Sequence, residues 1–446
     1  MNLIRKFKNI DGNKKKVFAN IFWAMLGKTV NMIGALFVGI LVARYLGPQQ
    51  YGLMNYVISY VAIFLVLGTF GLTNIEVREL SKTPELRDVL LGTFFKIRLF
   101  FCTIAYLLIC ITLIIFKTDG FTTLMILVYG ITLFTTGCFE VIRNYFSSII
   151  KNEYVVKSEI LRTIIGACIK IVLLYMRAPL SYFIAATVFD TVLVSSGYIL
   201  SYTKTTGSLK LWGFDKKLVP YILKQSFPLV LSGAAVIIYQ RIDQVMIGNM
   251  VDKEAVGYFS TAGKFLDLIL FLPYVLVQTV TPILVKAKKT MTNSDYRRIS
   301  YKFMSIVVWL AIILSLIVSL LSYPLIYYTY GEKYLAAVPV LQIMAWKTVG
   351  MAISSSGGQL IIIDGLQKWA VIRNLMGCFT CVLLNWLIIP YYGIIGSAFV
   401  TLITIAISGC FANAIIPPYW YMFRLEIKAL LKGWKELVYF KSIIKL

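Results

Sequence analysis

The sequence contains no histidine and few charged side chains. Charged residues make up 14% of its 446 positions, whereas hydrophobic residues make up 59%, and the mean hydropathy is +0.80. A soluble domain of this size would need far more polar surface to cover its core. The lack of histidine removes the commonest metal ligand and the commonest general base. These two shortages argue against a soluble protein and against an enzyme.

The seven cysteines are scattered, and all of them lie inside strongly apolar stretches. Cys378 and Cys381 form a CxxC pair, but one turn of membrane-buried helix in a chain without histidine makes a poor metal or redox site. We expect the thiols to behave as small apolar side chains. The sequence also lacks a nucleotide-binding motif, so we expect no cofactor and no ATP hydrolysis by this chain.

What the sequence does contain is a series of apolar stretches of roughly 20 residues, the length of a helix that crosses the hydrocarbon core. Their hydrophobicity is continuous and does not alternate with a period of two, which favours helices over strands. The predicted fold class is therefore all-α and integral to the membrane, with about 12 transmembrane helices. The predicted spans are residues 17–42, 53–75, 97–116, 121–142, 158–176, 180–202, 221–250, 257–285, 303–330, 337–363, 370–390 and 394–417.

Lysine and arginine are distributed unevenly among the segments that connect these spans. Of the 44 basic residues, 33 fall in or at the edge of segments on the same side as the N-terminus, 5 in the opposite loops and 6 deeper inside spans. Arg98, Lys224 and Arg373, which lie in the first turns of their predicted spans, are counted with the adjoining cytoplasmic segments. Because positively charged loops face the cytoplasm, we expect a multi-pass protein of the bacterial inner membrane with both termini cytoplasmic. The net charge of +24 then reflects contact with anionic phospholipids, and no nucleic acid is expected as a partner.

The two halves of the chain resemble each other. Residues 41–52 align with residues 245–257, which places Gly52 on Gly257, and each half has six predicted spans. An even number of spans gives both halves the same orientation, as in parallel repeats related by an axis along the membrane normal. The expected parts are a basic cytoplasmic segment at 1–16, an N-lobe at 17–202, a cytoplasmic linker at 203–220, a C-lobe at 221–417 and a basic amphipathic cytoplasmic segment at 418–446.

Three segments carry a resemblance to a known family. They are ARYLGPQQYG at residues 43–52, SFPLVLSGAAVIIYQRIDQVMIGNM at 226–250 and AVGYFSTAGK at 255–264. The segments resemble polysaccharide transporters of the Wzx type, the O-antigen flippases. These proteins belong to the superfamily of multidrug, oligosaccharidyl-lipid and polysaccharide exporters. The resemblance extends over nearly the whole chain in the number and order of the spans.

The resemblance implies a flippase that moves an undecaprenyl-pyrophosphate-linked oligosaccharide from the cytoplasmic to the outer leaflet by alternating access. The oligosaccharide would be a repeat unit of O-antigen, capsule or exopolysaccharide. Na⁺, H⁺ or the membrane potential would drive the cycle, and a polysaccharide polymerase and a chain-length regulator would be partners. A multidrug/cation antiporter of the same superfamily is the alternative, although it would favour an anionic cavity. A membrane-embedded polymerase or glycosyltransferase is more remote, because the outward loops are short.

Ionisable residues inside the spans form the candidate site. Each is costly in the hydrocarbon core unless it faces a cavity or a partner, and a pyrophosphate head group needs a cationic cavity. Lys28, Lys170 and Lys347 lie deep in their spans and have no obvious partner nearby. The candidate cavity cations are Lys28, Arg162, Lys170, Arg241, Lys264 and Lys347, with Asn31 and Asp190 as polar lining, and the candidate ion-coupling carboxylates are Glu140, Asp243, Asp267 and Asp364.

Several candidates also have a structural alternative. Lys264 and Asp267 lie three residues apart on one predicted helix and would form a pair. Arg162 and Arg241 lie near span ends, from which long basic side chains would snorkel to the interface. Asp190 would hold helices together as an interhelical hydrogen-bond partner. Glu140 and Asp364 would close salt bridges.

Overall fold

The described part of the chain is built from helices. The computed structural model describes residues 12–439, and within that range every regular element is helical. Nine helical stretches of this range are long and apolar enough to cross a membrane. Helices satisfy all their backbone polar groups internally, which a segment in lipid requires. The predicted fold class, an all-α integral membrane protein, is therefore confirmed.

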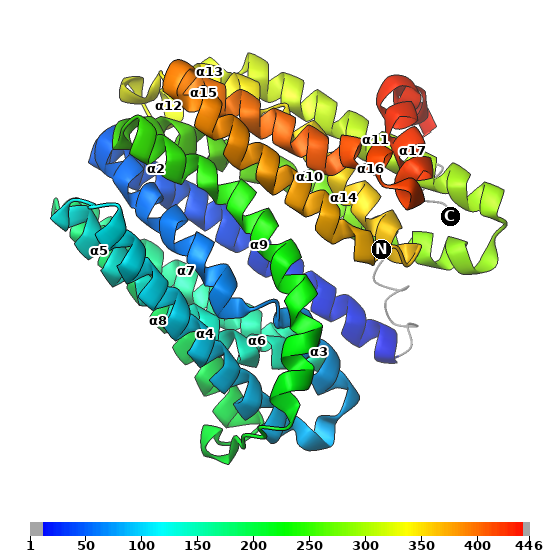
Figure 1. Cartoon of the computed structure of the whole chain (residues 1–446), viewed down its shortest axis with the longest axis horizontal. Helices are drawn as coiled ribbons and strands as arrows, with labels where there is room; N and C mark the ends of the chain where they lie inside the picture. The colour runs from blue at the N-terminus through cyan, green and yellow to red at the C-terminus, as the bar shows by residue number, and fades with distance from the viewer. Residues whose placement is uncertain (1–11, 440–446) are drawn as a thin grey trace, which may run out of the picture. The chain divides into compact units, whose positions relative to one another are not determined.

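The helices follow one another with short connections (Figure 1). Those of the first half are α2 (Gly12–Thr69), α3 (Thr73–Lys82), α4 (Arg87–Ile115), α5 (Gly120–Gly130), α6 (Phe139–Ser148), α7 (Asn152–Tyr175), α8 (Leu180–Thr205) and α9 (Leu218–Met250). Those of the second half are α10 (Lys253–Thr290), α11 (Asn293–Leu320), α12 (Ser322–Thr329), α13 (Ala337–Met344), α14 (Lys347–Ile363), α15 (Ala370–Ala406), α16 (Ala412–Ile415) and α17 (Trp420–Lys432). Two π-helical segments, η2 (Leu133–Cys138) and η6 (Ile407–Phe411), link α5 to α6 and α15 to α16.

Two of the long helices, α2 and α15, are broken within their length. α2 has 58 residues and α15 has 37, whereas about 20 residues cross the hydrocarbon core. Each is broken at one glycine with positive φ, Gly47 (φ 71°) before Pro48 and Gly393 (φ 53°) after Pro390. Glycine adopts such angles without steric cost. With each of these helices counted as two crossings and with the 24-residue α7 included, the described helices are compatible with the twelve predicted spans.

The chain divides into two compact units. Unit 1 contains the described residues up to Tyr45 and the segment Tyr60–Ala234, and unit 2 contains Leu46–Ser59 and the described residues from Ala235 onward. α2 and α9 therefore contribute to both units. The lobe boundaries expected from the sequence stay a prediction.

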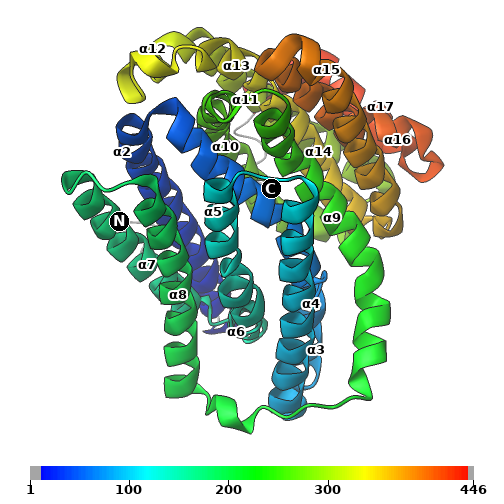
Figure 2. The ribbon, with the colours of Figure 1, turned by 60° about the vertical axis from the view of Figure 1, so that its left-hand side comes forward.

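Each unit has its own hydrophobic core. In unit 1 the core includes Leu91, Phe94 and Phe146, none of which is exposed to solvent. α7 and α8 pack against each other there and lie side by side in Figures 1 and 2. In unit 2, α10, α11, α14 and α17 enclose a second core, which includes Met304 and Met422. Close packing of this kind holds the polar side chains described below in fixed positions.

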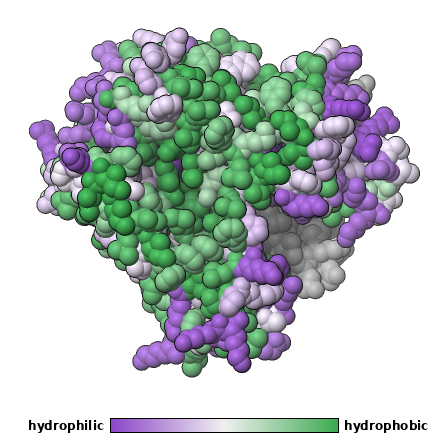
Figure 3. All heavy atoms as spheres, in the orientation of Figure 1, coloured by the Kyte–Doolittle hydropathy of each residue, from purple (hydrophilic) through white to green (hydrophobic). Residues whose placement is uncertain are grey.

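The outer surface suits a hydrocarbon solvent. Large side chains such as Phe37, Phe100, Ile114 and Phe379 are between 62% and 76% exposed. Hydrophobic residues cover most of the face shown in Figure 3, and hydrophilic residues gather toward its margins. Exposed apolar area of this extent does not occur on a soluble monomer. The surface is therefore that of a multi-pass membrane protein.

Gly52 and Gly257 bring two helix backbones of unit 2 into contact. A Cβ atom on Gly52 would collide with the Lys253 carbonyl oxygen and lie 2.7 Å from the Gly257 nitrogen. One on Gly257 would collide with the Pro48 carbonyl oxygen. Small residues permit such close approach between membrane helices. The two glycines that the internal repeat aligns therefore meet where the second part of α2 crosses the start of α10.

The C-terminal helix α17 is anchored by a buried carboxyl group. Glu426 is fully buried, and both its oxygens accept hydrogen bonds from Asn413 Nδ2, at 2.8 and 3.0 Å. Burial raises the pKa of Glu426 to about 8, although Asn413, the charge of Arg373 and Cys410 oppose the shift. On the same C-terminal segment, Leu431 is exposed and available to lipid.

We predict that Gly52→Ala destabilises the protein, because the added Cβ would collide with the backbone of α10. The free energy of unfolding should fall by about 3 kcal/mol, the upper range for overpacking. Gly39→Ala is the control, since a Cβ at that position of the same helix meets nothing within 4 Å. Thermal unfolding of both variants in detergent measures the difference, and equal midpoints would contradict the predicted backbone contact.

We also predict that stability depends on pH through Glu426. Its folded-state pKa of about 8 lies above the ordinary value of 4.5, so the folded protein binds this proton more tightly than the unfolded chain does. The free energy of unfolding should therefore be highest below pH 4.5 and fall as the pH rises toward about 8. Glu426→Gln should flatten this dependence in thermal melts, whereas Glu436→Gln should retain it.

Candidate functional site

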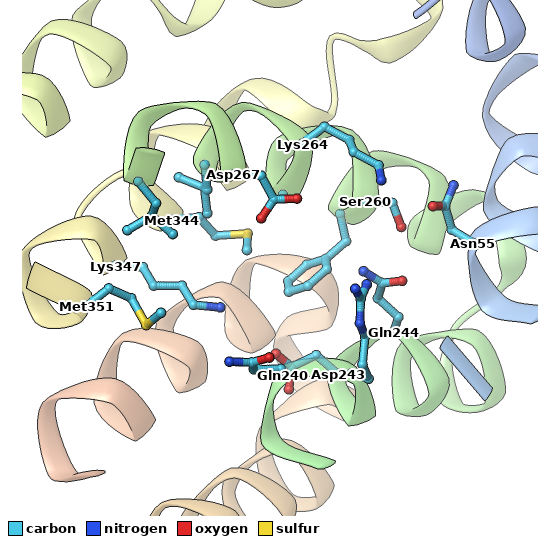
Figure 4. A pocket seen from close by; sticks show the side chains of 15 residues that line it. Asn55, Gln240, Asp243, Gln244, Ser260, Lys264, Asp267, Met344, Lys347 and Met351 are labelled. Atoms are coloured by element: carbon cyan, nitrogen blue, oxygen red, sulfur yellow. The ribbon is translucent and has the colours of Figure 1, made fainter. Parts of the chain in front are cut away.

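Unit 2 contains a cavity that gathers five of the residues predicted from the sequence. The cavity has a volume of about 160 Å³ and is lined by α9, α10, the end of α13 and the start of α14, together with Asn55 from the second part of α2. Figure 4 shows the side chains that surround it. The predicted residues among them are Arg241, Asp243, Lys264, Asp267 and Lys347. These five lie far apart in the sequence and come from three different helices.

The charges around this cavity are only partly compensated. Within residues 12–439, Arg241, Lys264 and Lys347 form no ion pair with any carboxylate. The pair that the spacing of Lys264 and Asp267 would allow is not made, and in Figure 4 the Lys264 ammonium points toward Ser260 and Asn55. Three cations therefore face two carboxylates. A cavity with this excess of positive charge suits an anionic ligand.

Asp243 occupies a different environment from the other charged residues of the cavity. It is 2% exposed. Its Oδ1 accepts hydrogen bonds from Asn385 Nδ2 (2.7 Å) and the Cys381 thiol (3.1 Å), and its Oδ2 accepts one from Thr401 Oγ1 (2.9 Å). Neutral partners on α15 thus hold a buried carboxyl group in place without a direct counter-charge. Such a group can gain and lose a proton or a metal cation.

The neutral residues of this site could not be singled out from the sequence. Gln240, Gln244, Asn55 and Ser260 also line the cavity, and Gln244 accepts a hydrogen bond from Ser59 at 2.5 Å. Amide and hydroxyl groups are common in membrane helices as interhelical hydrogen-bond partners. Their presence inside a span therefore does not separate cavity lining from packing, and only the structure assigns them to the cavity.

Unit 1 has a second cavity, of about 350 Å³, in which the charges are balanced. The predicted residues Asn31, Glu140 and Arg162 line it, together with Arg143 and Glu159, which were not predicted. Arg143 pairs with both carboxylates, at 3.5 Å and 3.7 Å. Arg162 donates a hydrogen bond to Asn31 at 3.3 Å. Mutual neutralisation of this kind leaves no excess charge for an anion.

Beside this cavity lies a buried charge network that was not predicted. Arg98 is completely buried and forms ion pairs with Glu76 at 2.5 Å and with Glu140 at 3.0 Å. It also donates to the Gly137 carbonyl oxygen, and Asn144 donates to Glu76. Arg98 was assigned to the basic positions near a cytoplasmic loop. The structure instead makes it the centre of a cluster that fixes α3, α4 and α6.

The remaining predicted residues lie outside both cavities. Lys170 of α7 forms an ion pair with Asp190 of α8 at 2.5 Å. Asp364, at the end of α14, pairs with Lys288 at 2.8 Å and accepts a hydrogen bond from Tyr296. The side chain of Lys28 lies outside the described residues. For Glu140 and Asp364, the salt-bridge alternative left open above is the arrangement that the structure contains.

These features define a class: multi-pass helical membrane proteins with a charged cavity among their spans. The profile of the family described as "Polysaccharide biosynthesis protein" matches residues 17–288, more than half of the chain. The chain belongs to this family, which confirms the resemblance stated above. Among curated proteins, no sequence is significantly similar to this chain.

Solved structures share the fold at low identity. The lipid II flippase MurJ, in an inward closed conformation, aligns with a TM-score of 0.69 over 95% of this chain and 93% of MurJ, at 18% identity. An inward-facing MATE family multidrug resistance transporter of the MOP superfamily aligns with a TM-score of 0.62 over 92% and 96% of the two chains, at 15% identity. A mutant of the Vibrio cholerae MATE transporter VcmN gives 0.59 over 93% and 96%, at 14% identity. At these identities the likeness establishes the fold alone.

We predict that Arg98→Ala strongly destabilises unit 1. Removal of the guanidinium leaves Glu76 buried without its counter-charge, which costs about 3–5 kcal/mol in comparable pairs. Arg78→Ala is the control, because Arg78 pairs with Glu79 at a largely exposed position, where such pairs contribute about 1 kcal/mol or less. Unfolding in detergent compares the two variants. Equal losses of stability would show that the Arg98 network does not hold the unit together.

Proposed function

We propose that the protein is a flippase that moves an undecaprenyl-pyrophosphate-linked oligosaccharide from the cytoplasmic to the outer leaflet. The observation that carries the proposal is a set of three cations, Arg241, Lys264 and Lys347, which line one cavity of unit 2 and form no ion pair with any carboxylate in residues 12–439. Membership of the polysaccharide biosynthesis family and a fold shared with a lipid II flippase support it. The protein would act as a transporter and not as an enzyme.

The cations would stabilise the head group during its passage. A pyrophosphate cannot enter hydrocarbon alone, because transfer of an unpaired charge into a low-dielectric medium is prohibitive. Arg241 and the two lysines would replace its lost hydration with charge-assisted hydrogen bonds. Amides such as Gln240 and Gln244 offer further donors and acceptors to the attached sugar. The polyprenyl chain would remain in the lipid throughout.

Asp243 is the coupling carboxylate in this proposal. It is the most deeply buried of the four carboxylates predicted for that role, and its partners are neutral. Glu140 and Asp364 are engaged with basic residues, which leaves them less free to exchange an ion. Uptake of H⁺ or Na⁺ at Asp243 would change the charge balance around the cavity and thereby the affinity for the pyrophosphate.

A multidrug/cation antiporter is the second candidate. The shared fold with MATE transporters and the carboxylates Asp243 and Asp267 beside the cavity favour it. The excess of positive charge opposes it, because a cationic drug would be repelled. Transport of a lipid-linked anion fits the charge balance better.

The proposal also includes the cellular setting. We place the protein in the bacterial inner membrane with both termini cytoplasmic, since basic residues are concentrated on that side of the predicted spans. Anionic phospholipids would contact these loops. A polysaccharide polymerase and a chain-length regulator would act on the product in the outer leaflet.

We predict that Lys264→Ala and Lys347→Ala each reduce flipping by about tenfold to a hundredfold. A hydrogen bond to a charged group contributes about 1.5–3 kcal/mol, which corresponds to this range. The matching arginine substitutions should retain most of the activity, because they keep the charge. Lys286→Ala is the control, since Lys286 is exposed on the same helix as Lys264. Wild-type activity of both cavity variants, at normal protein levels, would refute the role of the cations.

Depletion of the protein tests the substrate. Mass spectrometry of the lipid fraction should then find accumulated undecaprenyl-pyrophosphate-linked glycan, and this glycan should remain accessible only from the cytoplasmic side. An unchanged lipid pool together with reduced efflux of cationic drugs would favour the antiporter instead.

A further inference from the structure

Two stretches of the α15 region carry polar residues along one face each. In the first, Arg373, Gly377, Cys381 and Asn385 follow one another at four-residue intervals. In the second, after the break at Gly393, Ser397, Thr401, Thr404 and Ser408 follow at intervals of three or four. Residues at such spacing share one side of a helix. The two polar faces lie within unit 2 and meet a third element, α9.

Contacts between these elements connect the cavity with the C-terminal helix. At one end, Asp243 of α9 is bonded to Asn385 and Thr401, as described above. One turn further along α9, the Tyr239 carbonyl oxygen accepts a hydrogen bond from the Cys381 thiol. Gly377 then lies against Ser408, because a Cβ at Gly377 would be 2.6 Å from the Ser408 Cβ and 3.7 Å from the Tyr239 ring.

The other end of the series is Glu426. Arg373 interacts electrostatically with both Tyr239 and Glu426 and therefore lies near each of them. Asn413, just beyond η6, donates to the Glu426 carboxylate. At 1.5 Å per residue, the stretch from Ser397 to Asn413 rises about 24 Å. We call this series of side chains the polar column.

Several polar atoms of the column are buried and have no hydrogen-bond partner among the described residues. They are Asn385 Oδ1 and Ser397 Oγ on the Asp243 side, and Arg373 Nε and Nη1 and Asn413 Oδ1 on the Glu426 side. Between these two groups, the side chain of Thr404 contacts Cys381 and that of Ser408 contacts Tyr239. Buried polar atoms in folded proteins are almost always hydrogen-bonded, either to protein or to internal water. Groups of such atoms at both ends of the column therefore indicate bound water molecules, which the side chains between them connect.

We propose that water molecules bound along the polar column carry a proton between Asp243 and Glu426. The inference rests on the proposed coupling role of Asp243. In each transfer one O–H bond breaks and another forms: Glu426 releases its proton to the nearest water, each water passes one proton on, and Asp243 receives the last. Glu426 is then reprotonated from the cytoplasmic side. One proton moves, and no electron is exchanged.

The column favours a proton over a metal cation. Its side chains supply hydroxyl, thiol and amide groups, which support a hydrogen-bonded chain, whereas the column between Asp243 and Glu426 contains no further carboxylate that would bind Na⁺ in passing. The charged groups that face Asp243 are Lys347 and, across the cavity, Arg241, Lys264 and Asp267.

Around Glu426, the charged or titratable groups are Arg373 and Cys410. Asn413 and Gly357 of α14 also lie against Glu426 and add no charge. The pKa of about 8 allows Glu426 to bind and release a proton near neutral pH.

Time-resolved infrared spectroscopy of the full-length protein in lipid nanodiscs tests the proposal. After a pH jump, the carboxyl stretching band that disappears in Asp243→Asn reports the protonation of Asp243. In Glu426→Gln, the rate of this change should fall about tenfold or more. Glu436→Gln, on the same C-terminal segment, should leave the rate unchanged. Equal rates in Glu426→Gln and the wild type would overturn the proposal, as would an Asp243 band that never responds to pH.

Two further measurements separate the column from the proposed function. A high-resolution structure should contain ordered water beside Asn385 and Ser397 and beside Arg373 and Asn413. Dry, closed interfaces at both places would overturn the column even if Glu426→Gln did not fold. Flipping by Asp243→Asn is assayed independently. Wild-type flipping by that variant would refute the coupling role, while the infrared rates would still decide whether a proton path exists.

Discussion

The cost of placing a charge in hydrocarbon governs the arrangement of this protein. An ionisable side chain inside a membrane span must be paired or must face a polar cavity. Arg98 follows the first course: two carboxylates, a carbonyl oxygen and complete burial leave it no capacity for a ligand. Arg241, Lys264 and Lys347 follow the second, and they surround a cavity without forming ion pairs in the described range. This contrast separates structural charges from those available for binding.

The same constraint explains why the carboxylates differ. Glu140, Asp190 and Asp364 each lie within ion-pair distance of a basic residue. Asp243 accepts its hydrogen bonds from neutral groups and forms no ion pair within the described residues, although the charge of Lys347 acts on it. The elements that hold it continue as the polar column toward Glu426. A protein that couples transport to an ion needs one acidic group whose occupancy can change. In unit 2 the surroundings of Asp243 meet that requirement, and those of the paired carboxylates do not.

Hydropathy alone predicted the fold class, because continuous apolar stretches of about 20 residues are long enough to cross the hydrocarbon core as helices. The break at Gly47 was visible as a Gly-Pro pair between two spans. It was also predictable that Arg241, Lys264 and Lys347 would each face a cavity or a partner, since an ionisable side chain in hydrocarbon is costly otherwise. Their common location in one cavity required the structure. The contact between Gly52 and Gly257, which the internal repeat aligns with each other, also required the structure.

Pairings between helices were beyond the reach of the sequence. Lys170 and Asp190 lie 20 positions apart on successive helices, and spacing does not determine how such helices rotate toward each other. Arg98 was misjudged for a related reason: basic residues near span ends usually face the interface, but the fold of unit 1 turns this one inward. The contacts of Asn385 and Thr401 with Asp243 could not be predicted, because neutral polar residues cost little free energy in a helix bundle and are common there.

The central claim is that the cavity serves a lipid-linked anion. Its most direct test uses vesicles that contain the purified protein and a fluorescent undecaprenyl-pyrophosphate-linked sugar, with a membrane-impermeant quencher added outside. The account predicts that the protein makes the inner-leaflet probe accessible to the quencher, and that the same vesicles do not transport a cationic dye such as ethidium. Dye transport without movement of the lipid-linked probe would contradict it.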